Sequence, residues 1–304
     1  MGTILLYYKY VDISDVELIA KWQKKLCKSL ELTGRIILAK EGINGTVGGS
    51  QEATAAYIAA MEAHPLFGGI DFKTALGDNN YFPRMRVVIK EEIVKLGVDT
   101  DKVKAADGGT HLTPEQAHEL MSNPPKNLVI LDTRNNYESR IGTFRNSLTP
   151  DIDTFRDFPE YIDKNLDTFK DKTVLMHCTG GVRCERATTY LKQKGVAQEI
   201  YQIEGGIHRY VEKFPEGHFR GSNYVFDARI AQKVNDDVLS NCDLCKTPCD
   251  HYTNCVNARC NKQFLACPAC ITTYQECCGK ECFDLVQAGK TVIRKKPLRP
   301  HLNA

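Results

Sequence analysis

The chain has 304 residues, of which 42% are hydrophobic and 26% charged, and its formal net charge is +2. This length allows two or three domains, each with its own core. The balanced charge excludes a uniformly basic nucleic-acid-binding protein, so any basic surface must be local. The composition is typical of globular proteins, and no apolar run reaches the length of a transmembrane helix.

The first residues, MGTILLYYKYVD, contain an apolar run that is too short for a signal peptide. We therefore expect a cytoplasmic protein with no membrane partner. Of the thirteen cysteines, only Cys27, Cys178 and Cys184 precede residue 240. The other ten are concentrated near the C-terminus, which indicates two kinds of cysteine chemistry.

Residues 1–97 alternate strand and helix signals. Strands are predicted at 3–10 and 34–39, with a helix capped near Ser14 between them, and the glycines of KEGINGTVGG (40–49) predict a tight turn between strands. A helix at 51–64 and strands at 71–76 and 85–94 follow. The order βαββαβ predicts an α+β domain of the ferredoxin-like or acylphosphatase-like type. A polar, glycine-punctuated linker is expected at 98–110.

Residues 111–220 have the pattern of an α/β domain. Its first helix is expected to begin at Pro114, with Thr113 as N-cap. The stretches NLVILDTR (127–134), TVLMHC (173–178) and EIYQIEGG (199–206) predict buried strands of a parallel sheet, whose functional loops lie at the carboxyl ends of the strands. Residues 221–304 form a cysteine-rich segment with a basic tail.

The loop from Cys178 to Cys184, CTGGVRC, joins a predicted strand to a predicted helix that begins at Cys184 or Glu185. Backbone N–H groups at a helix N-terminus favour an anion, so a thiol placed there ionises more readily and becomes a nucleophile. The alternative is an inert buried cysteine. The site predicted from this loop consists of Cys178 as the catalytic residue, with Thr179, Gly180, Gly181, Val182, Arg183 and Cys184 around it.

Loop length distinguishes two reaction classes. Cysteine phosphatases have five residues between cysteine and arginine, whereas sulfur carriers of the rhodanese type have four, as in this chain. Two further segments, LDTRNNYESRIGTFRNS (131–147) and IEGGIHRY (203–210), resemble the other rhodanese motifs, although residues 142–144 read Gly-Thr-Phe where Gly-His-Ile is usual. The three motifs together resemble a rhodanese domain.

Four polar or sulfur-bearing residues near the loop have expected roles of their own. We expect Asp132 and Arg134 to form a structural ion pair or to hold a neighbouring loop. We expect His177 to lie beneath the loop as a structural residue, with a role as a base as the alternative. Cys184 is expected to cap the following helix, with a role as resolving thiol as the alternative.

Nearly the whole chain resembles the rhodanese-related tRNA uridine hydroxylases, on the basis of HCTGGVRCERA (177–187), the preceding KEGINGT (40–46) and the cysteine-rich segment. The resemblance implies oxygen-dependent 5-hydroxylation of the wobble uridine of tRNA, with Cys178 as an active-site cysteine that is able to carry a persulfide. It also implies tRNA and molecular oxygen as partners, with a sulfur-donor protein as a further candidate. A sulfurtransferase and a non-enzymatic RNA-binding module are the alternatives. No sequence motif identifies a redox cofactor.

Two segments combine features that suit RNA: YFPRMRVVIK (81–90) carries aromatic and arginine side chains, and the tail carries cations. These tail cations are Lys290, Arg294, Lys295, Lys296 and Arg299.

The C-terminal cysteines have the spacing of structural metal ligands. Paired Cys-x2-Cys units about twenty residues apart suit a four-cysteine zinc site, and ten cysteines could supply two sites with two left over. We expect zinc, with an iron–sulfur cluster or disulfides as alternatives, and His251 could replace one cysteine. The candidate ligands are Cys242, Cys245, Cys249, Cys255, Cys260, Cys267, Cys270, Cys277, Cys278 and Cys282.

Overall fold

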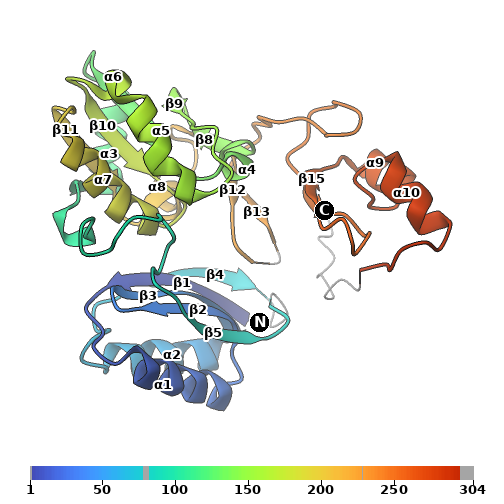
Figure 1. The fold of residues 1–304 in the computed structure, drawn as a ribbon, viewed down its shortest axis with the longest axis horizontal. Helices are drawn as coiled ribbons and strands as arrows, with labels where there is room; N and C mark the ends of the chain where they lie inside the picture. Colours follow the sequence, from blue (N-terminus) through green and yellow to red (C-terminus); the bar gives the residue numbers. More distant parts are fainter. Residues whose placement is uncertain (1, 78–81, 228, 295–304) are drawn as a thin grey trace.

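The computed structural model describes residues 2–77, 82–227 and 229–294, and its N-terminal part is a five-stranded sheet with two helices on one face (Figure 1). The strand order is β4-β1-β3-β2-β5, and every neighbouring pair is antiparallel except β2 and β5. This confirms the ferredoxin-like prediction, and the strand predicted at 85–94 is found as β5, a parallel edge strand beside β2. The elements are β1 (Gly2–Tyr10), α1 (Val16–Ser29), β2 (Thr33–Ala39), β3 (Gly42–Ser50), α2 (Gln51–Glu62), β4 (Lys73–Gly77) and β5 (Met85–Ile89).

Two local predictions in this domain differ in detail from the structure. Helix α1 is capped by Asp15, whose side chain accepts the Leu18 N–H, and not by Ser14. The predicted tight turn is formed by Lys40 and Glu41 between β2 and β3, with Gly42 at positive φ, but the remaining glycines lie within strand β3. Its glycines serve close packing: a Cβ added at Gly45 would lie 2.3 Å from the ring of Tyr7.

The two faces of this sheet have different roles. Leu5, Ile36 and Val47 point to the helices and belong to the core of the domain. Because strand side chains alternate, Leu6 and Arg35 point the other way. They line a cleft that faces the second domain.

The second domain is built on a five-stranded parallel sheet with the order β6-β11-β10-β7-β9, which confirms the predicted α/β class. Helix α3 begins at Pro114 with Thr113 as its N-cap, as predicted. The elements are β6 (Thr110–Leu112), α3 (Pro114–Ser122), β7 (Leu128–Asp132), α4 (Asn136–Ser139), β8 (Gly142–Phe144), β9 (Ser147–Leu148), α5 (Phe158–Lys164), α6 (Leu166–Phe169), β10 (Thr173–His177), α7 (Val182–Lys194), β11 (Glu199–Ile203) and α8 (Gly206–Lys213), with 3-10 turns at Ala105–Asp107 and Phe155–Asp157.

The segment between these sheets is packed against the second domain. Leu96 and Val103 are buried in the core that also contains residues of α7. Arg186 of α7 is fully buried and donates to the backbone oxygens of Val98 and Val103. It also pairs with the Glu92 carboxylate at 2.5 Å, so this segment fixes the N-terminal domain on α7.

The C-terminal region continues from the second domain through a short sheet, β13-β12-β8. Beyond it lies a small module, seen at the right of Figure 1, whose interior consists largely of cysteines and a few apolar side chains. The elements are β12 (Phe219–Tyr224), β13 (Ala231–Lys233), β14 (Tyr252–Asn254), β15 (Gln263–Leu265), α9 (Pro268–Thr273) and α10 (Lys280–Gln287). Within residues 2–77, 82–227 and 229–294, no helix combines the length and apolarity needed to cross a bilayer.

Candidate active site

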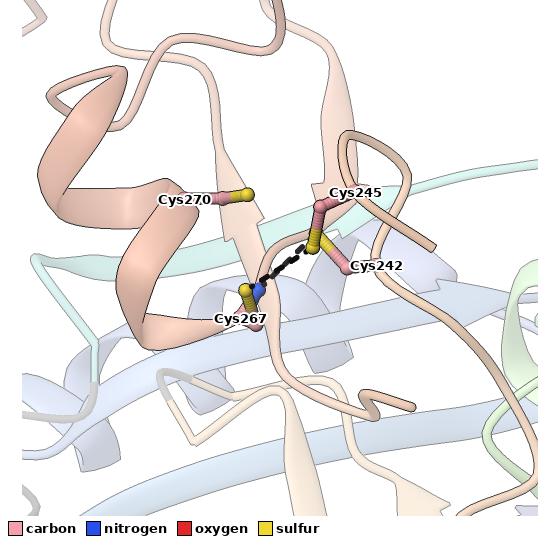
Figure 2. A group of neighbouring side chains, drawn as sticks. All are labelled: Cys242, Cys245, Cys267 and Cys270. Atoms are coloured by element: carbon pink, nitrogen blue, oxygen red, sulfur yellow. Dashed lines mark hydrogen bonds between the residues drawn. The ribbon is translucent and has the colours of Figure 1, made fainter. Parts of the chain in front are cut away.

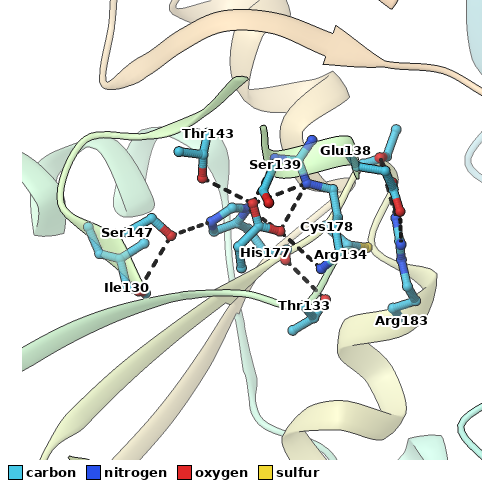
Figure 3. Close-up of polar contacts among 12 residues, drawn as sticks. Ile130, Thr133, Arg134, Glu138, Ser139, Thr143, Ser147, His177, Cys178 and Arg183 are labelled. Atoms are coloured by element: carbon cyan, nitrogen blue, oxygen red, sulfur yellow. Dashed lines mark hydrogen bonds and ion pairs between the residues drawn. The ribbon is translucent and has the colours of Figure 1, made fainter. Parts of the chain in front are cut away.

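Cys178 follows β10 and lies at the N-terminus of α7, with its side chain fully buried (Figure 3). Its Sγ accepts the Gly181 N–H at 3.1 Å. Burial alone would raise the pKa of this thiol, but hydrogen bonds from the Cys184 thiol and from the backbone N–H groups of Arg183 and Gly181, together with the Arg183 charge, lower the pKa to about 5. Cys178 is therefore a thiolate at neutral pH.

The Arg183 guanidinium is held by a buried carboxylate. Glu138 of α4 accepts from Arg183 Nη1 at 2.5 Å and from Nη2 at 2.7 Å, in the paired geometry visible in Figure 3. Burial alone would lower the pKa of Arg183, but the charge and hydrogen bonds of Glu138 raise this pKa above its usual range. The positive charge beside the thiolate is thus fixed in position.

The predicted cap role of Cys184 was wrong. Helix α7 begins at Val182 with Gly181 as its N-cap, so Cys184 already lies in the first turn. Its thiol hydrogen-bonds to Cys178, and its Sγ lies 3.6 Å from Thr133 Oγ1. Burial and the neighbouring Cys178 thiolate raise the pKa of Cys184, which keeps this thiol protonated as a donor.

Beneath the loop, Asp132 and Arg134 form the predicted structural ion pair, with Arg134 Nη2 2.7 Å from Asp132 Oδ2 and both side chains fully buried. Thr143, which occupies the position where rhodanese motifs usually have histidine, donates to Asp132 Oδ2 at 3.0 Å. His177 is buried as predicted, with Nε2 3.0 Å from Ser147 Oγ. Burial lowers the pKa of His177 to about 4, so its ring is neutral.

The closing motif, which contains Gly205 and Gly206, holds the loop from behind. The Ile207 N–H donates to the Cys178 carbonyl at 2.9 Å, and the His208 N–H donates to the Thr179 carbonyl at 3.0 Å. A Cβ at Gly206 would lie 2.5 Å from the Cys178 carbonyl oxygen. The glycine is therefore required by the close approach of α8 to the loop.

The N-terminal domain packs directly on the loop. A Cβ at Gly181, whose φ is 102°, would lie 2.7 Å from Tyr8 Oη, and one at Gly180 would lie 3.2 Å from Leu6. Tyr8 Oη donates to Glu185 Oε1 of α7 at 2.8 Å. These contacts between domains could not be inferred from the sequence, because no local pattern pairs residues 177 positions apart.

The contact between the two domains leaves a cleft of about 1320 Å³ with Cys178 and its loop at one wall. The opposite wall is the open face of the N-terminal sheet. Aromatic and cationic side chains line the cleft together, and this mixture suits a nucleobase with its phosphates. They are Tyr8, Phe82, Phe155, Phe226, Arg35, Lys40, Lys90, Lys95, Arg156 and Arg183.

The structure describes part of the two segments that the sequence suggested for RNA. Phe82 and Lys90 line the cleft, whereas Tyr81 lies outside the described residues. In the tail, Lys290 and Arg294 lie at the end of the described chain, and Lys295, Lys296 and Arg299 lie outside it. The sequence did not single out Phe226, which no motif marks.

Eight of the ten C-terminal cysteines form two groups, and within each group the four sulfur atoms lie within 4.8 Å of one another. The first group is Cys242, Cys245, Cys267 and Cys270, drawn in Figure 2. The second is Cys255, Cys260, Cys278 and Cys282. Cys249, Cys277 and His251 belong to neither group.

The sulfur positions fit a tetrahedral metal. Zn–S bonds of about 2.3 Å imply S–S edges of about 3.8 Å. Cys245 and Cys267 are 3.6 Å apart, and Cys278 and Cys282 are 3.8 Å apart. The Cys267 N–H donates to Cys242 Sγ at 3.4 Å, an interaction that favours a thiolate ligand.

Comparison with known proteins places this arrangement in a class. Residues 113–213 match the family described as "Rhodanese-like domain", residues 2–93 match "UPF0176 acylphosphatase like domain", and residues 220–283 match "Rhodanase C-terminal". A rhodanese-related protein from Thermoplasma volcanium shares 24% identity over 34% of this chain and 92% of its own, with a TM-score of 0.28. The family matches make the chain a rhodanese-domain protein with an acylphosphatase-like N-terminal domain.

Relatives that match along most of the chain make the family more specific. The tRNA uridine(34) hydroxylase of Corynebacterium urealyticum is 40% identical over 91% of this chain and 96% of that protein. The tRNA uridine(34) hydroxylase of Chlamydia trachomatis is 37% identical over 97% of this chain and 93% of that protein. The chain belongs to the tRNA uridine(34) hydroxylase family.

Proposed function

We propose that this protein hydroxylates the wobble uridine, position 34 of tRNA, to 5-hydroxyuridine in the cytoplasm, with molecular oxygen as oxidant. The names of its full-length relatives support this reaction. The observation that carries the assignment in this chain is the Cys178 thiolate, lowered in pKa to about 5, in a cleft lined by aromatic and cationic side chains. Such a cleft can admit an unpaired base and bring it to a nucleophile.

The chemistry assigned to Cys178 is nucleophilic. Addition of its Sγ to C6 of the uracil ring forms an S–C6 bond and moves an electron pair towards C5, the carbon that gains oxygen. C5 then bonds to one atom of O2, and two electrons from a thiol reductant break the O–O bond, so that one oxygen stays on C5 and the other leaves as water. Loss of the C5 proton and departure of the thiolate restore the double bond. Overall, uridine, O2, two electrons and two protons give 5-hydroxyuridine and water, and we assign the two electrons to a thiol reductant, which becomes a disulfide.

The purified chain tests this proposal. Incubation with unmodified tRNA, a thiol reductant and 18O2 is expected to give 5-hydroxyuridine that carries the heavy isotope, as measured by nucleoside mass spectrometry. Cys178→Ala should give no product. Its matched control is Cys27→Ala, which removes another buried thiol far from the loop in sequence. Product formation by Cys178→Ala at the wild-type rate would remove the assignment.

A sulfurtransferase is the second candidate, favoured by the four residues between Cys178 and Arg183. In that reaction a donor, either thiosulfate or a sulfur-donor protein, leaves a persulfide on Cys178. Transfer of sulfur from thiosulfate to cyanide that depends on Cys178, without formation of 5-hydroxyuridine, would favour this function over the first.

We further propose that each four-cysteine group binds one structural zinc ion, because the S–S distances match the edges of a tetrahedron and are far longer than a disulfide bond of about 2.0 Å. The groups alternate along the chain: the second pair of the first site lies between the two pairs of the second site. We therefore expect formation of one site to favour formation of the other.

Metal analysis is expected to find two zinc ions per chain. Cys267→Ser should lower the affinity of both sites, whereas the matched changes Cys249→Ser and Cys277→Ser should leave the metal content unchanged. Loss of a single ion from Cys267→Ser, with the other site at its original affinity, would contradict the interdependence. Iron in place of zinc would contradict the choice of metal.

A further inference from the structure

Phe226 is an aromatic residue that the rest of the structure leaves exposed. It follows β12, and 52% of its side chain is accessible to solvent, although Tyr224 beside it is buried. It is the one phenylalanine among the exposed large apolar residues of the described chain. Because this half-exposed ring lines the cleft, its free face is available to a ligand.

The position of Phe226 relates it to the reactive loop. Its ring lies 5.9 Å from the Arg183 guanidinium carbon, and it lines the cleft together with Cys178 and Thr179. Tyr224 supports it from behind, with ring centroids 5.3 Å apart. The Phe226 ring thus forms part of the cleft wall and lies over the Arg183 guanidinium, the cation that stabilises the thiolate.

The opposite wall offers a second ring. Phe82 precedes β5 of the N-terminal domain and approaches β3, where a Cβ at Gly48 would lie 3.6 Å from it. Cations from both domains accompany the two rings, among them Arg35, Lys90 and Arg156. An apolar protein segment would not need these cations, whereas an RNA loop requires them for its phosphates.

We propose that Phe226 is the residue on which the base to be modified stacks, with Arg183 beneath the ring and Cys178 within the same cleft. This assignment rests on the proposed function and deepens it by naming the side chain that receives the base. Stacking supplies affinity without reading the identity of the base, since every base offers a flat face. Phe226 is thus a positioning residue, because its ring orients the base towards the thiolate.

The test uses the full chain and an anticodon stem-loop RNA that carries the fluorescent base 2-aminopurine at position 34. Stacking on a ring quenches this base. Wild type and Phe226→Tyr should quench it equally. Phe226→Leu keeps an apolar side chain but lacks the ring, and should lose the quenching and bind about tenfold more weakly. Leu18→Ala, which truncates an exposed side chain of α1, is the matched control and should behave as wild type.

Two results would overturn the assignment: Phe226→Leu that quenches and binds like wild type, or wild type that binds the RNA without quenching. Both are independent of the hydroxylation reaction. If quenching depends on the Phe226 ring but the protein makes no 5-hydroxyuridine, the proposed reaction is refuted and the base-stacking role is retained. Formation of 5-hydroxyuridine with no effect of Phe226→Leu on binding or quenching would retain the reaction and refute the role.

Discussion

Cys178 and Cys27 are both buried, yet the pKa values of their thiols should be shifted in opposite directions. Burial raises the pKa of Cys27 to about 12, whereas the donors around Cys178 lower its pKa from 9.0 to about 5. A shift of that size corresponds to about 5 kcal/mol in favour of the thiolate. At pH 7 the thiolate fraction of Cys178 should therefore exceed that of an unperturbed thiol about a hundredfold.

Alkylation by iodoacetamide, followed peptide by peptide with mass spectrometry across pH 4 to 10, measures both thiols in one sample. The rate for the Cys178 peptide is expected to be half-maximal near pH 5. Cys184→Ala removes a donor to the thiolate and should move this midpoint to higher pH, while Cys184→Ser keeps a hydroxyl donor and should move it less. A midpoint for Cys178 between pH 8 and 9, as for a free thiol, would refute the reasoning.

Three further outcomes follow from the packing around the loop. Gly181→Ala should lose activity in the tRNA assay because its Cβ would meet Tyr8. The control is Gly195→Ala, which is also at positive φ but has nothing within 4 Å of the added Cβ. It should lower the free energy of unfolding by about 1 kcal/mol and remain active. Arg186→Met, which leaves buried carboxylate and carbonyl groups unpaired, should lower the free energy of unfolding by about 3 kcal/mol in urea titrations, and a change below 1 kcal/mol would contradict the anchoring role. Because the folded-state pKa of Cys178 is depressed, its thiolate stabilises the fold above pH 9 and loses that effect as pH falls towards 5. The difference in free energy of unfolding between wild type and Cys178→Ala should therefore decrease as the pH falls from 9 to 5. A difference that does not change with pH would contradict this prediction.

The sequence predicted those parts of the fold that depend on local pattern. Apolar alternation and turn residues gave the ferredoxin-like order of elements, and the Thr113–Pro114 pair located the start of α3. It predicted the strand at 85–94 but not its place in the sheet, because the parallel pairing of β5 with β2 depends on contacts distant in sequence. The glycines of β3 were assigned to a turn because the sequence does not distinguish a glycine needed for close packing against a ring, such as Gly45 against Tyr7, from a glycine needed for a turn.

The site was predictable to a similar extent. Cys178, Arg183 and the two glycines between them follow from one local motif, and the structure places donors around the sulfur. Cys184 was assigned to the cap because the helix was expected to start two or three residues later than it does. Phe226 was missed because its relation to the loop arises only when β12 returns beside β8.

The C-terminal module contacts the elements that support the active site. Tyr252 Oη donates to the Tyr137 carbonyl at 2.9 Å, and Arg140 Nη2 lies 2.5 Å from Asp243 Oδ1. Tyr137 adjoins Glu138, the partner of Arg183. The module therefore supports, through α4, the carboxylate that holds the guanidinium beside the thiolate, although none of its clustered cysteines belongs to the loop itself.

The central claim is that Cys178 is the group through which this chain modifies tRNA. Its most direct test is nucleoside mass spectrometry of tRNA from cells that lack the protein and carry either the wild-type chain or Cys178→Ala at equal abundance. We predict 5-hydroxyuridine at position 34 with the wild-type chain and none with the variant. Equal amounts of 5-hydroxyuridine in the two strains would contradict the account.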